Sequence, residues 1–447
     1  MQLKSLLLVG VAVTAFVTGV QAAEAPDLST CASDHLRVSD VAPATLLLAQ
    51  TDAPRAPQTS SDAIPAPIAA PTPVPVDIGA APAVPDPANI YSETSQDHQG
   101  PSTALPRVYV PNHSNNTVSV IDLNTKKVID TFKVGKGPQH VVPSFDMKTL
   151  WVNNTADGTT KGSVTPIDPE TGKPAGPEIA VDDPYNMYFT PDGKYAIVVA
   201  EAYRRLDIRD AHTMQLVSSI PTPTCDGLNH ADYTADFSEM IFTCEFGGVY
   251  SGKHGQAPKD KNAGPSLIKV DLKKGEVTGE LTFSKPGMPQ DARLSPDGKT
   301  FFVTDMMNDG VFLVDAATFT EVGFIFTGKG AHGLNVSRDG KYLYVANRGS
   351  NRMPDKWGGP GSVSVINFAT HAVEHTWLIP GGGSPDMGNV TPDGKELWLS
   401  GRYDGVVYCI DTSTGDVTKI NVGIEPHGLT VWPQVGRFSL GHTGNMR

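Results

Sequence analysis

Cysteine is scarce in this sequence of 447 residues: four are present, and none belongs to a Cys-x-x-Cys-His motif. A covalently attached c-type haem is therefore excluded within this chain. Basic residues are also few, since 35 Lys and Arg stand against 48 Asp and Glu, for a formal net charge of −13. A nucleic-acid surface needs clustered positive charge to displace counterions, so we expect no nucleic-acid partner.

Long hydrophobic runs are absent beyond the N-terminus, so we expect no membrane span. Residues 6–17 form an apolar run behind a lysine, followed by a Val-Gln-Ala sequence, which is typical of a cleaved secretory signal. The sequence predicts a signal peptide over residues 1–22 and a periplasmic or secreted mature protein. Residues 23–106 are rich in Pro and Ala and poor in aromatics, and they predict a disordered tether because they cannot bury enough surface to offset ordering.

A single pattern repeats seven times between Gln139 and Leu429: a loop, a short strand, a turn and a second strand. A repeat of roughly 40–45 residues holding four strands is typical of a β-propeller blade. An Asp-Gly turn supplies the positive φ that a tight hairpin needs. The clearest copies of this turn are Pro191-Asp192-Gly193, Pro296-Asp297-Gly298, Arg338-Asp339-Gly340 and Pro392-Asp393-Gly394.

The sequence therefore predicts an all-β fold, a seven-bladed β-propeller over residues 107–432. Its first repeat lacks an inner strand, and its last, at residues 428–432, consists of an inner strand and little more. We expect these two ends to complete one blade, which removes the free sheet edges. Residues 433–447 are left as a C-terminal tail that either forms another strand or caps the ring.

Two second strands, Tyr344-Val345-Ala346-Asn347 and Tyr109-Val110-Pro111-Asn112, carry a Tyr-Val-x-Asn sequence beside the Asp-Gly turns. In these features the chain resembles the YVTN-type (40-residue repeat) periplasmic β-propeller family, over about residues 107–432. The resemblance implies the propeller fold. It implies no single activity, because such propellers include surface scaffolds, lactonase-like enzymes, haem-d1 domains and metal-binding periplasmic proteins.

Histidines gather where the inner strands begin, a place that a propeller brings together around its central channel. We expect His140, His230, His332 and His427 to converge on one channel mouth and to bind a transition metal, because neutral imidazoles on different rigid blades suit such ions. His332 and His427 share a repeat position and are the expected partners, whereas His140 and His230 come one residue later. The alternative is that a wet channel mouth simply tolerates solvated imidazoles.

The second strands should end on the same face of the ring. Among the residues there, Glu245 and Asp305 are expected to orient the imidazoles and are the candidate catalytic carboxylates. Two insertions, residues 247–265 and 349–361, also emerge on this face, where they would act as lids.

Two cysteines lie on neighbouring strands of one repeat, Cys225 before an inner strand and Cys244 at the end of the next. In an oxidising compartment we expect a disulfide between them, with thiolate ligands beside His230 as the alternative. The glycine pattern Gly328-x-Gly330-x-x-Gly333 matches a dinucleotide fingerprint by letter. It leads into a strand and not a helix, so we reject that interpretation.

Together these features predict an exported metal-binding propeller, with copper favoured over zinc. It would act as an oxidoreductase on a small molecule at the axial channel mouth. The alternative is a non-catalytic binding propeller, either a metal carrier or a scaffold with a periplasmic protein partner. A metal-free hydrolase or lyase using a channel histidine with Glu245 or Asp305 is a third hypothesis, which no nucleophile motif supports.

Overall fold

The computed structural model describes residues 76–80, 82–83, 86–94, 103–247, 264–350 and 360–447. All belong to one compact unit, which begins at Asp62; the other unit, Met1–Ser61, lies outside the described residues. The predicted signal peptide, most of the predicted tether and the centres of both predicted lids (248–263 and 351–359) also lie outside them. No helix among the described residues is both long enough and apolar enough to cross a bilayer.

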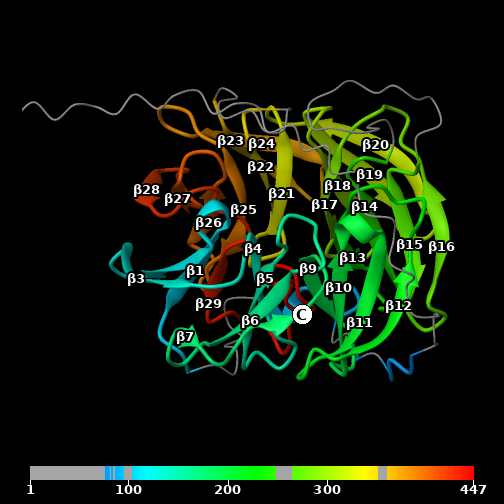
Figure 1. The fold of residues 1–447 in the computed structure, drawn as a ribbon. Coiled ribbons are helices and arrows are strands. Elements are labelled where there is room, and N and C mark those ends of the chain that lie inside the picture. The colour runs from blue at the N-terminus through cyan, green and yellow to red at the C-terminus, as the bar shows by residue number, and fades with distance from the viewer. Residues whose placement is uncertain (1–75, 81, 84–85, 95–102, 248–263, 351–359) are drawn as a thin grey trace, which may run out of the picture. The chain divides into compact units, whose positions relative to one another are not determined.

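The described chain forms seven antiparallel sheets arranged as blades around one axis (Figure 1). Three single-turn 3-10 helices accompany them: η1 (Ser92–Thr94), η2 (His113–Asn115) and η3 (Glu201–Tyr203). From the inner strand outwards, the closing blade consists of β29 (Thr430–Trp432), β1 (Arg107–Asn112), β2 (Thr117–Asp122) and β3 (Lys127–Lys133), and the next of β4 (Pro138–Pro143), β5 (Leu150–Asn154), β6 (Ser163–Asp168) and β7 (Lys173–Pro174) with β8 (Ile179–Ala180). In the same order, the third, fourth and fifth blades are β9 (Pro184–Phe189), β10 (Tyr195–Ala200), β11 (Arg205–Asp210) and β12 (Leu216–Pro221); β13 (Leu228–Tyr233), β14 (Glu239–Cys244), β15 (Leu267–Asp271) and β16 (Glu276–Leu281); and β17 (Pro289–Leu294), β18 (Thr300–Asp305), β19 (Gly310–Asp315) and β20 (Thr320–Phe326). The sixth and seventh blades are β21 (Ala331–Val336), β22 (Tyr342–Asn347), β23 (Ser362–Asn367) and β24 (Ala372–Leu378); and β25 (Pro385–Val390), β26 (Glu396–Gly401), β27 (Val406–Asp411) and β28 (Val417–Asn421).

The prediction of a seven-bladed, all-β propeller is confirmed. The expected closure is also present, because β29 pairs antiparallel with β1, with Thr430 opposite Tyr109. Burial follows the position of each strand in its blade: every residue of the inner strand β13 is buried, whereas the outer strand β16 alternates between exposed and half-buried residues. The apolar cores lie between neighbouring blades, as where Trp398 of β26 packs with Val108 and Val431 of the closing blade.

The turns between the inner and second strands share one hydrogen-bonded motif. In six blades a Ser or Thr hydroxyl donates to an Asp carboxylate two residues later, at 2.6–2.7 Å. The pairs are Ser144–Asp146, Thr190–Asp192, Thr234–Asp236, Ser295–Asp297, Ser337–Asp339 and Thr391–Asp393. The hydroxyls of such pairs also accept backbone N–H groups across the turn, so the turn satisfies its own polar groups.

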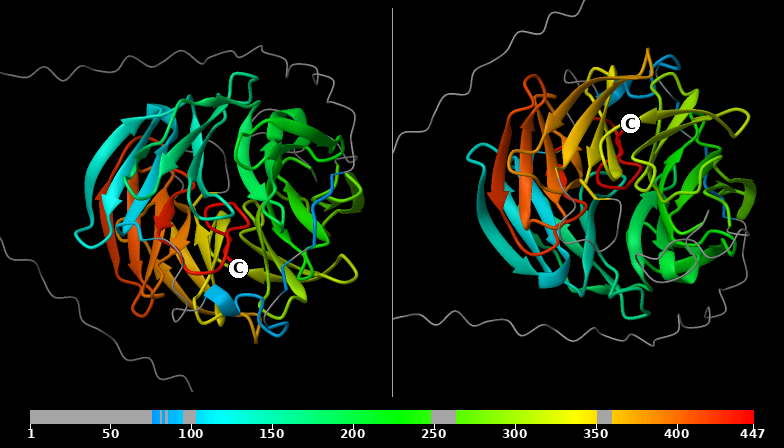
Figure 2. Two further views of the ribbon diagram at one scale, coloured as in Figure 1. Left: turned by 90° about the horizontal axis from the view of Figure 1, so that it is seen from below. Right: turned by 90° about the horizontal axis from the view of Figure 1, so that it is seen from above.

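The tail at residues 433–447 caps the ring, which is one of the two arrangements the sequence left open. Figure 2 shows this segment, in red, inside the ring of blades. The Ser439 N–H donates to the carbonyl of Phe145 (3.2 Å), just beyond the end of β4, and Leu440 accepts from the Phe189 N–H (3.1 Å) at the end of β9. These contacts lie at the ends of inner strands, so the tail closes the end of the channel opposite to the predicted site.

Part of the predicted tether 23–106 packs on the propeller. Ile78, Ile90 and Tyr91 are buried in the apolar cores, and the Tyr91 hydroxyl donates to the carbonyl of Leu294 (2.9 Å). These three side chains are therefore packed on the blades, in a segment whose composition predicted a disordered tether. Isolated apolar side chains in a Pro-rich segment find partners only once the blades exist, which composition does not reveal.

Candidate metal centre at the channel mouth

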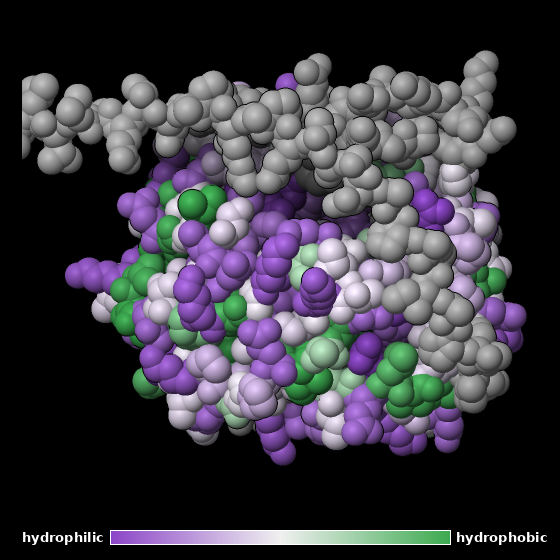
Figure 3. Space-filling view, viewed as in Figure 1, coloured by the Kyte–Doolittle hydropathy of each residue, from purple (hydrophilic) through white to green (hydrophobic). Residues whose placement is uncertain are grey.

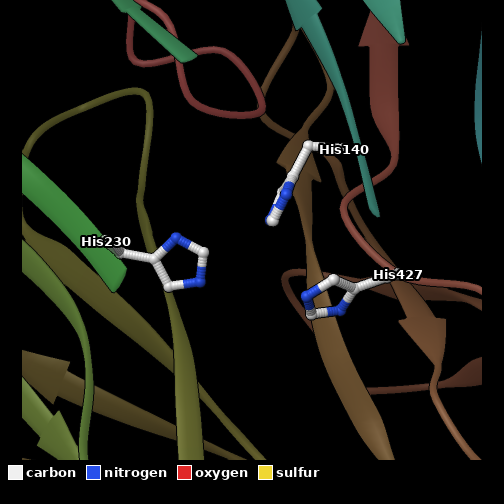
Figure 4. Close-up of side chains that lie close together, drawn as sticks. All are labelled: His140, His230 and His427. Atoms are coloured by element: carbon white, nitrogen blue, oxygen red, sulfur yellow. The ribbon is translucent and has the colours of Figure 1, made fainter. Parts of the chain in front are cut away.

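The four predicted histidines lie together in the channel, although they come from different blades. The ring centroids of His140 and His427 are 4.8 Å apart, and those of His140 and His230 are 5.2 Å apart. His332 lies 6.0 Å from His427 and 6.2 Å from His230 on the same measure. Three of the four, His140, His230 and His427, each offer one potential metal-ligand atom, and these three atoms lie within 4.8 Å of one another. Figure 4 shows the three rings facing a common space.

An irregularity in the inner strands explains why both repeat positions reach the axis. The ladder shifts register between Ala331 and Leu334 in β21, and between Leu228 and Ala231 in β13. A β-bulge of this kind re-aims the side chains beside it. His332, at the first position of the repeated pair, and His230, at the second, therefore both point into the channel.

His140 and His427 each have one ring nitrogen fixed by a hydrogen bond. The Nδ1–H of His140 donates to the carbonyl of Tyr185 (2.8 Å), and its Nε2 is buried without a hydrogen-bond partner in the part of the chain that the structure describes. Nδ1 of His427 lies 2.7 Å from Oδ2 of Asp386. Donation from Nδ1 leaves the lone pair on Nε2, which is the arrangement found in most histidine ligands of metals.

Asp386 is the carboxylate that contacts two imidazoles. Its Oδ1 lies 2.8 Å from Nδ1 of His332 and 2.9 Å from the Arg348 guanidinium, while Oδ2 accepts from His427. Burial alone would raise the pKa of Asp386, but Arg348 and the two imidazoles hold it well below its ordinary value. The site therefore contains one fixed negative charge beside neutral rings.

His230 differs in its hydrogen bonding. Oδ1 of Asn186 accepts the Met187 N–H (2.8 Å), which directs the Asn186 amide NH₂ towards Nδ1 of His230 at 3.0 Å. A ring nitrogen that accepts a hydrogen bond is unprotonated, so the neutral ring carries its proton on Nε2. To become a ligand through Nδ1, His230 must give up its hydrogen bond from Asn186. To become a ligand through Nε2, it must first move its proton to Nδ1.

Burial lowers the pKa of every imidazole in the cluster. The pKa of His140 falls to about 4, and those of His230, His332 and His427 are also lowered, in each case chiefly because the charged ring would lose its hydration. The rings are neutral at physiological pH and need no proton loss to bind a metal at a free lone pair.

A fifth histidine, His442, enters the cluster from the tail. Its ring centroid lies 4.7 Å from that of His230 and 5.9 Å from that of His140. Its Nδ1 accepts the Thr443 N–H (2.6 Å), and its Nε2 lies 3.5 Å from Oδ1 of Asp291. Sequence reasoning missed this residue because it lies outside the repeat, where no position in the ring could be assigned to it.

The two carboxylates predicted to orient the imidazoles have other contacts. Asp305 accepts the backbone N–H groups of Met307 (3.0 Å) and Asn308 (2.9 Å) and so closes the turn after β18. Glu245 accepts from the side-chain amides of Asn229 (3.2 Å) and Gln290 (3.1 Å). Within the described part of the chain neither makes a hydrogen bond or an ion pair with an imidazole, whereas Asp386 contacts two.

A cavity of about 440 Å³ opens above the imidazoles. His332 and His427 lie in its wall, together with Tyr185, Glu245 and Arg402. A hydrophilic hollow is visible near the top of the view in Figure 3. A small molecule in this cavity would contact the rings that face it.

Cys225 and Cys244 form a disulfide. The alternative in which both are thiolate ligands beside His230 is therefore excluded. The bridge ties the loop before β13 to the end of β14, at the edge of the cavity.

Fold and site together define a class: a seven-bladed β-propeller with a buried histidine cluster beneath a solvent cavity. A sequence model of the YNCE-like beta-propeller family matches residues 78–241, in agreement with the YVTN-type character of the repeats. No curated protein matches the sequence.

Solved structures share the fold. The dihydro-heme d1 dehydrogenase NirN, in complex with DHE, is 15% identical with a TM-score of 0.52, over 78% of this chain and 83% of its own. A functionally unknown protein from Desulfotomaculum acetoxidans is 16% identical with a TM-score of 0.54, over 73% and 98%. Apo AztD from Citrobacter koseri is 13% identical with a TM-score of 0.50, over 75% and 100%. These likenesses establish the fold and no activity.

Proposed function

We propose that this chain is an exported metal-binding propeller whose ion lies among His140, His230 and His427, and that it acts as an oxidoreductase on a small molecule in the cavity above. The observation that carries the proposal is the convergence of three buried histidines, each with one potential ligand atom within 4.8 Å of those of the other two. Two of their nitrogens, Nε2 of His140 and Nε2 of His230, are buried without a hydrogen-bond partner among the described residues. A buried polar atom in that state costs free energy that a bound ion would recover.

The ligand set favours copper over zinc. Imidazole nitrogens suit both ions, and for a given nitrogen site the affinity of divalent copper exceeds that of zinc. The Asp386 carboxylate beside His427 raises the basicity of that ring, as such a partner does in known metal sites. A bound copper ion would supply one-electron chemistry, while the residues of the cavity would bind and orient the substrate.

The burial of these ligands favours a resident ion over an exchangeable cargo. His140 is fully buried, and His427 has only 2% of its surface exposed. A carrier needs ligands that a partner can reach, whereas a catalytic centre needs one open side and a substrate cavity. The disulfide supports export, because such bridges persist in oxidising compartments.

The test is metal binding by isothermal titration with Cu²⁺ and Zn²⁺. The parent should bind one ion tightly, with copper preferred, and the double variant His140→Ala/His427→Ala should lose at least about 100-fold in affinity because two of three ligands are gone. His375→Ala, which changes an exposed histidine on the outer strand β24, should bind as the parent does.

Circular dichroism of each variant checks that the fold persists. Electron paramagnetic resonance of the copper-loaded parent should show coupling to ligand nitrogens, which the double variant should lack. Equal affinities in the parent and the double variant would refute the proposed site.

A further inference from the structure

We propose that the cavity above the imidazoles is a binding site for a small zwitterion. Its cationic end would lie against Glu201 and Glu245, and its carboxylate against Arg402. This inference goes beyond the proposed metal site and does not depend on it.

Most charges around the cavity already have a partner within the protein. His113 contacts Asp157 (3.5 Å) and Glu425 (3.3 Å). Arg204 pairs with Asp226 at 2.8 Å. On the floor of the cavity, Arg348 pairs with Asp386 at 2.9 Å. These groups compensate one another and leave few charges available to a ligand.

The charges left over on one wall are all negative: Asp183, which accepts the Ala202 N–H and pairs with no cation among the described residues, Glu201 and Glu245. Glu201 begins η3, and Glu245 follows β14 on the neighbouring blade, so the two carboxyls share one side of the cavity. Glu245 accepts only from the neutral amides of Asn229 and Gln290 within the described residues, where no cation pairs with Glu201 either.

Burial raises the pKa of both carboxyls, and for Glu201 the nearby Glu245 raises it further. Glu245 is buried and Glu201 is half-buried, and without a counter-cation among the described residues both lack the partner that would make their charged forms favourable. An ammonium or guanidinium group on a ligand would supply it.

The charge left over elsewhere in the cavity is positive. Arg402 follows β26, and two blades separate its blade from that of Glu245 in one direction round the ring and three in the other. Within the described part of the chain its guanidinium makes one hydrogen bond, to Oε1 of Gln139 (3.2 Å). A guanidinium has five N–H donors in a fork that matches a carboxylate, so Arg402 has donors free for one.

Between these poles the cavity can hold the uncharged part of a ligand. Its volume of about 440 Å³ lies within the range of roughly 300–1,000 Å³ typical of small-molecule sites. Tyr185, Phe246 and Tyr403 line it and offer aromatic surface to an alkyl chain. A molecule with opposite charges at its two ends therefore complements the cavity.

The experiment uses a series of unbranched amino acids, from β-alanine to 6-aminohexanoate, as a molecular ruler. Binding to the metal-free chain is measured by isothermal titration and repeated after addition of Cu²⁺. We expect one chain length to bind most tightly, and the alkyl amine and the alkyl carboxylate of that length to bind at least about 10-fold more weakly, because each lacks one charge-assisted contact.

Two variants test the negative and the positive end of the cavity, and a third is a control. Glu201→Gln and Arg402→Gln should each weaken binding of the preferred amino acid at least about 10-fold. Arg402→Gln should leave binding of the amine unchanged. Glu276→Gln, on the exposed face of β16, is the matched control and should bind as the parent does.

The outcomes separate this proposal from the metal site, because the first titration contains no metal. Absence of binding across the whole series would overturn it. So would an amine that binds as tightly as the amino acid, or variants that bind as the parent does. Equal metal affinities in the parent and the histidine double variant, together with one preferred amino-acid length, would count only against the proposed metal site or its ligands.

Discussion

The position of one proton divides the clustered imidazoles into two kinds. His140 and His427 are held with a proton on Nδ1 and a lone pair on Nε2, whereas His230 and His442 accept at Nδ1 and carry the proton on Nε2. Only the first kind is ready to bind a metal through Nε2. Asn186, through its amide, thus holds His230 in the less suitable form.

The variant Asn186→Asp should therefore raise the copper affinity of the chain, by about 10-fold. An Asp carboxylate can still accept the Met187 N–H, but it accepts from Nδ1 of His230 and moves the proton off Nε2. Isothermal titration at constant pH measures the effect. Asn389→Asp is the control, because Asn389 also accepts a backbone N–H (Val431, 2.9 Å) on an inner strand. A fall in affinity for Asn186→Asp would contradict the assigned tautomer.

Asp183 predicts a pH dependence of stability. Burial raises the pKa of its carboxyl from an ordinary 3.8 to about 7 in the folded state. Between these values the folded chain binds a proton that the unfolded chain releases, so the free energy of unfolding falls as pH rises from about 4 to 7. The variant Asp183→Asn removes this dependence, and its amide oxygen can still accept the Ala202 N–H.

Asp183→Asn should match the parent near pH 4 and exceed it in stability above pH 7. The gain is at most ~4 kcal/mol, since one pKa unit corresponds to about 1.4 kcal/mol. Asn also suits the left-handed backbone at this position, where φ is 39°. Urea unfolding from pH 4 to pH 8 measures both proteins, and two parallel pH profiles would contradict the assignment.

Two elements outside the repeat, the segment around Tyr91 and the C-terminal tail, complete the propeller. The residues around Tyr91 pack between blades, and the guanidinium of Arg447 lies 4.3 Å from the centre of the Tyr91 ring. Arg447 in turn pairs with Asp232 on β13 (3.0 Å). The N-terminal segment and the tail therefore contact one another as well as the blades.

Deleting residues 23–94 should lower the melting temperature, whereas deleting residues 23–75 should leave it nearly unchanged. The longer deletion removes Ile90 and Tyr91, and burial of each such side chain contributes about 1.5–3 kcal/mol. Differential scanning calorimetry measures both. Tyr91→Ala in the full chain should reproduce part of the loss, and equal melting temperatures for the two deletions would show that these contacts stabilise nothing.

These two elements could not be predicted from the sequence for a common reason. The blades repeat, so the turn at Asp192-Gly193 and the strand after it could be recognised in several copies. The tail binds in part through backbone groups, such as the His442 N–H donating to the carbonyl of Met187 (2.8 Å), and backbone groups carry no sequence signal. Composition alone assigned the segment around Tyr91 to a tether.

At the scale of the whole ring, symmetry made the histidine cluster predictable. Every inner strand starts at the same channel, so four histidines could be placed near one mouth from their repeat positions. Repeat position paired His332 with His427, whereas the histidines with the nearest ligand atoms are His140, His230 and His427. Repeat position did not reveal the hydrogen bonds of Asp305, because the loops after the second strands differ and its carboxylate turns back onto its own backbone. Repeat position determines where a residue lies, while local hydrogen bonds determine where its side chain points.

The pairing of β29 with β1 has a consequence for how the protein is made. The blade that closes the ring combines strands from the first and the last repeat, so almost the entire propeller must be synthesised before the ring can shut. Until then β1 lacks its inner neighbour and presents an open edge to other chains. Contacts so distant in sequence form slowly. A chain that crosses a membrane N-terminus first would therefore need protection from aggregation until its last strand arrives.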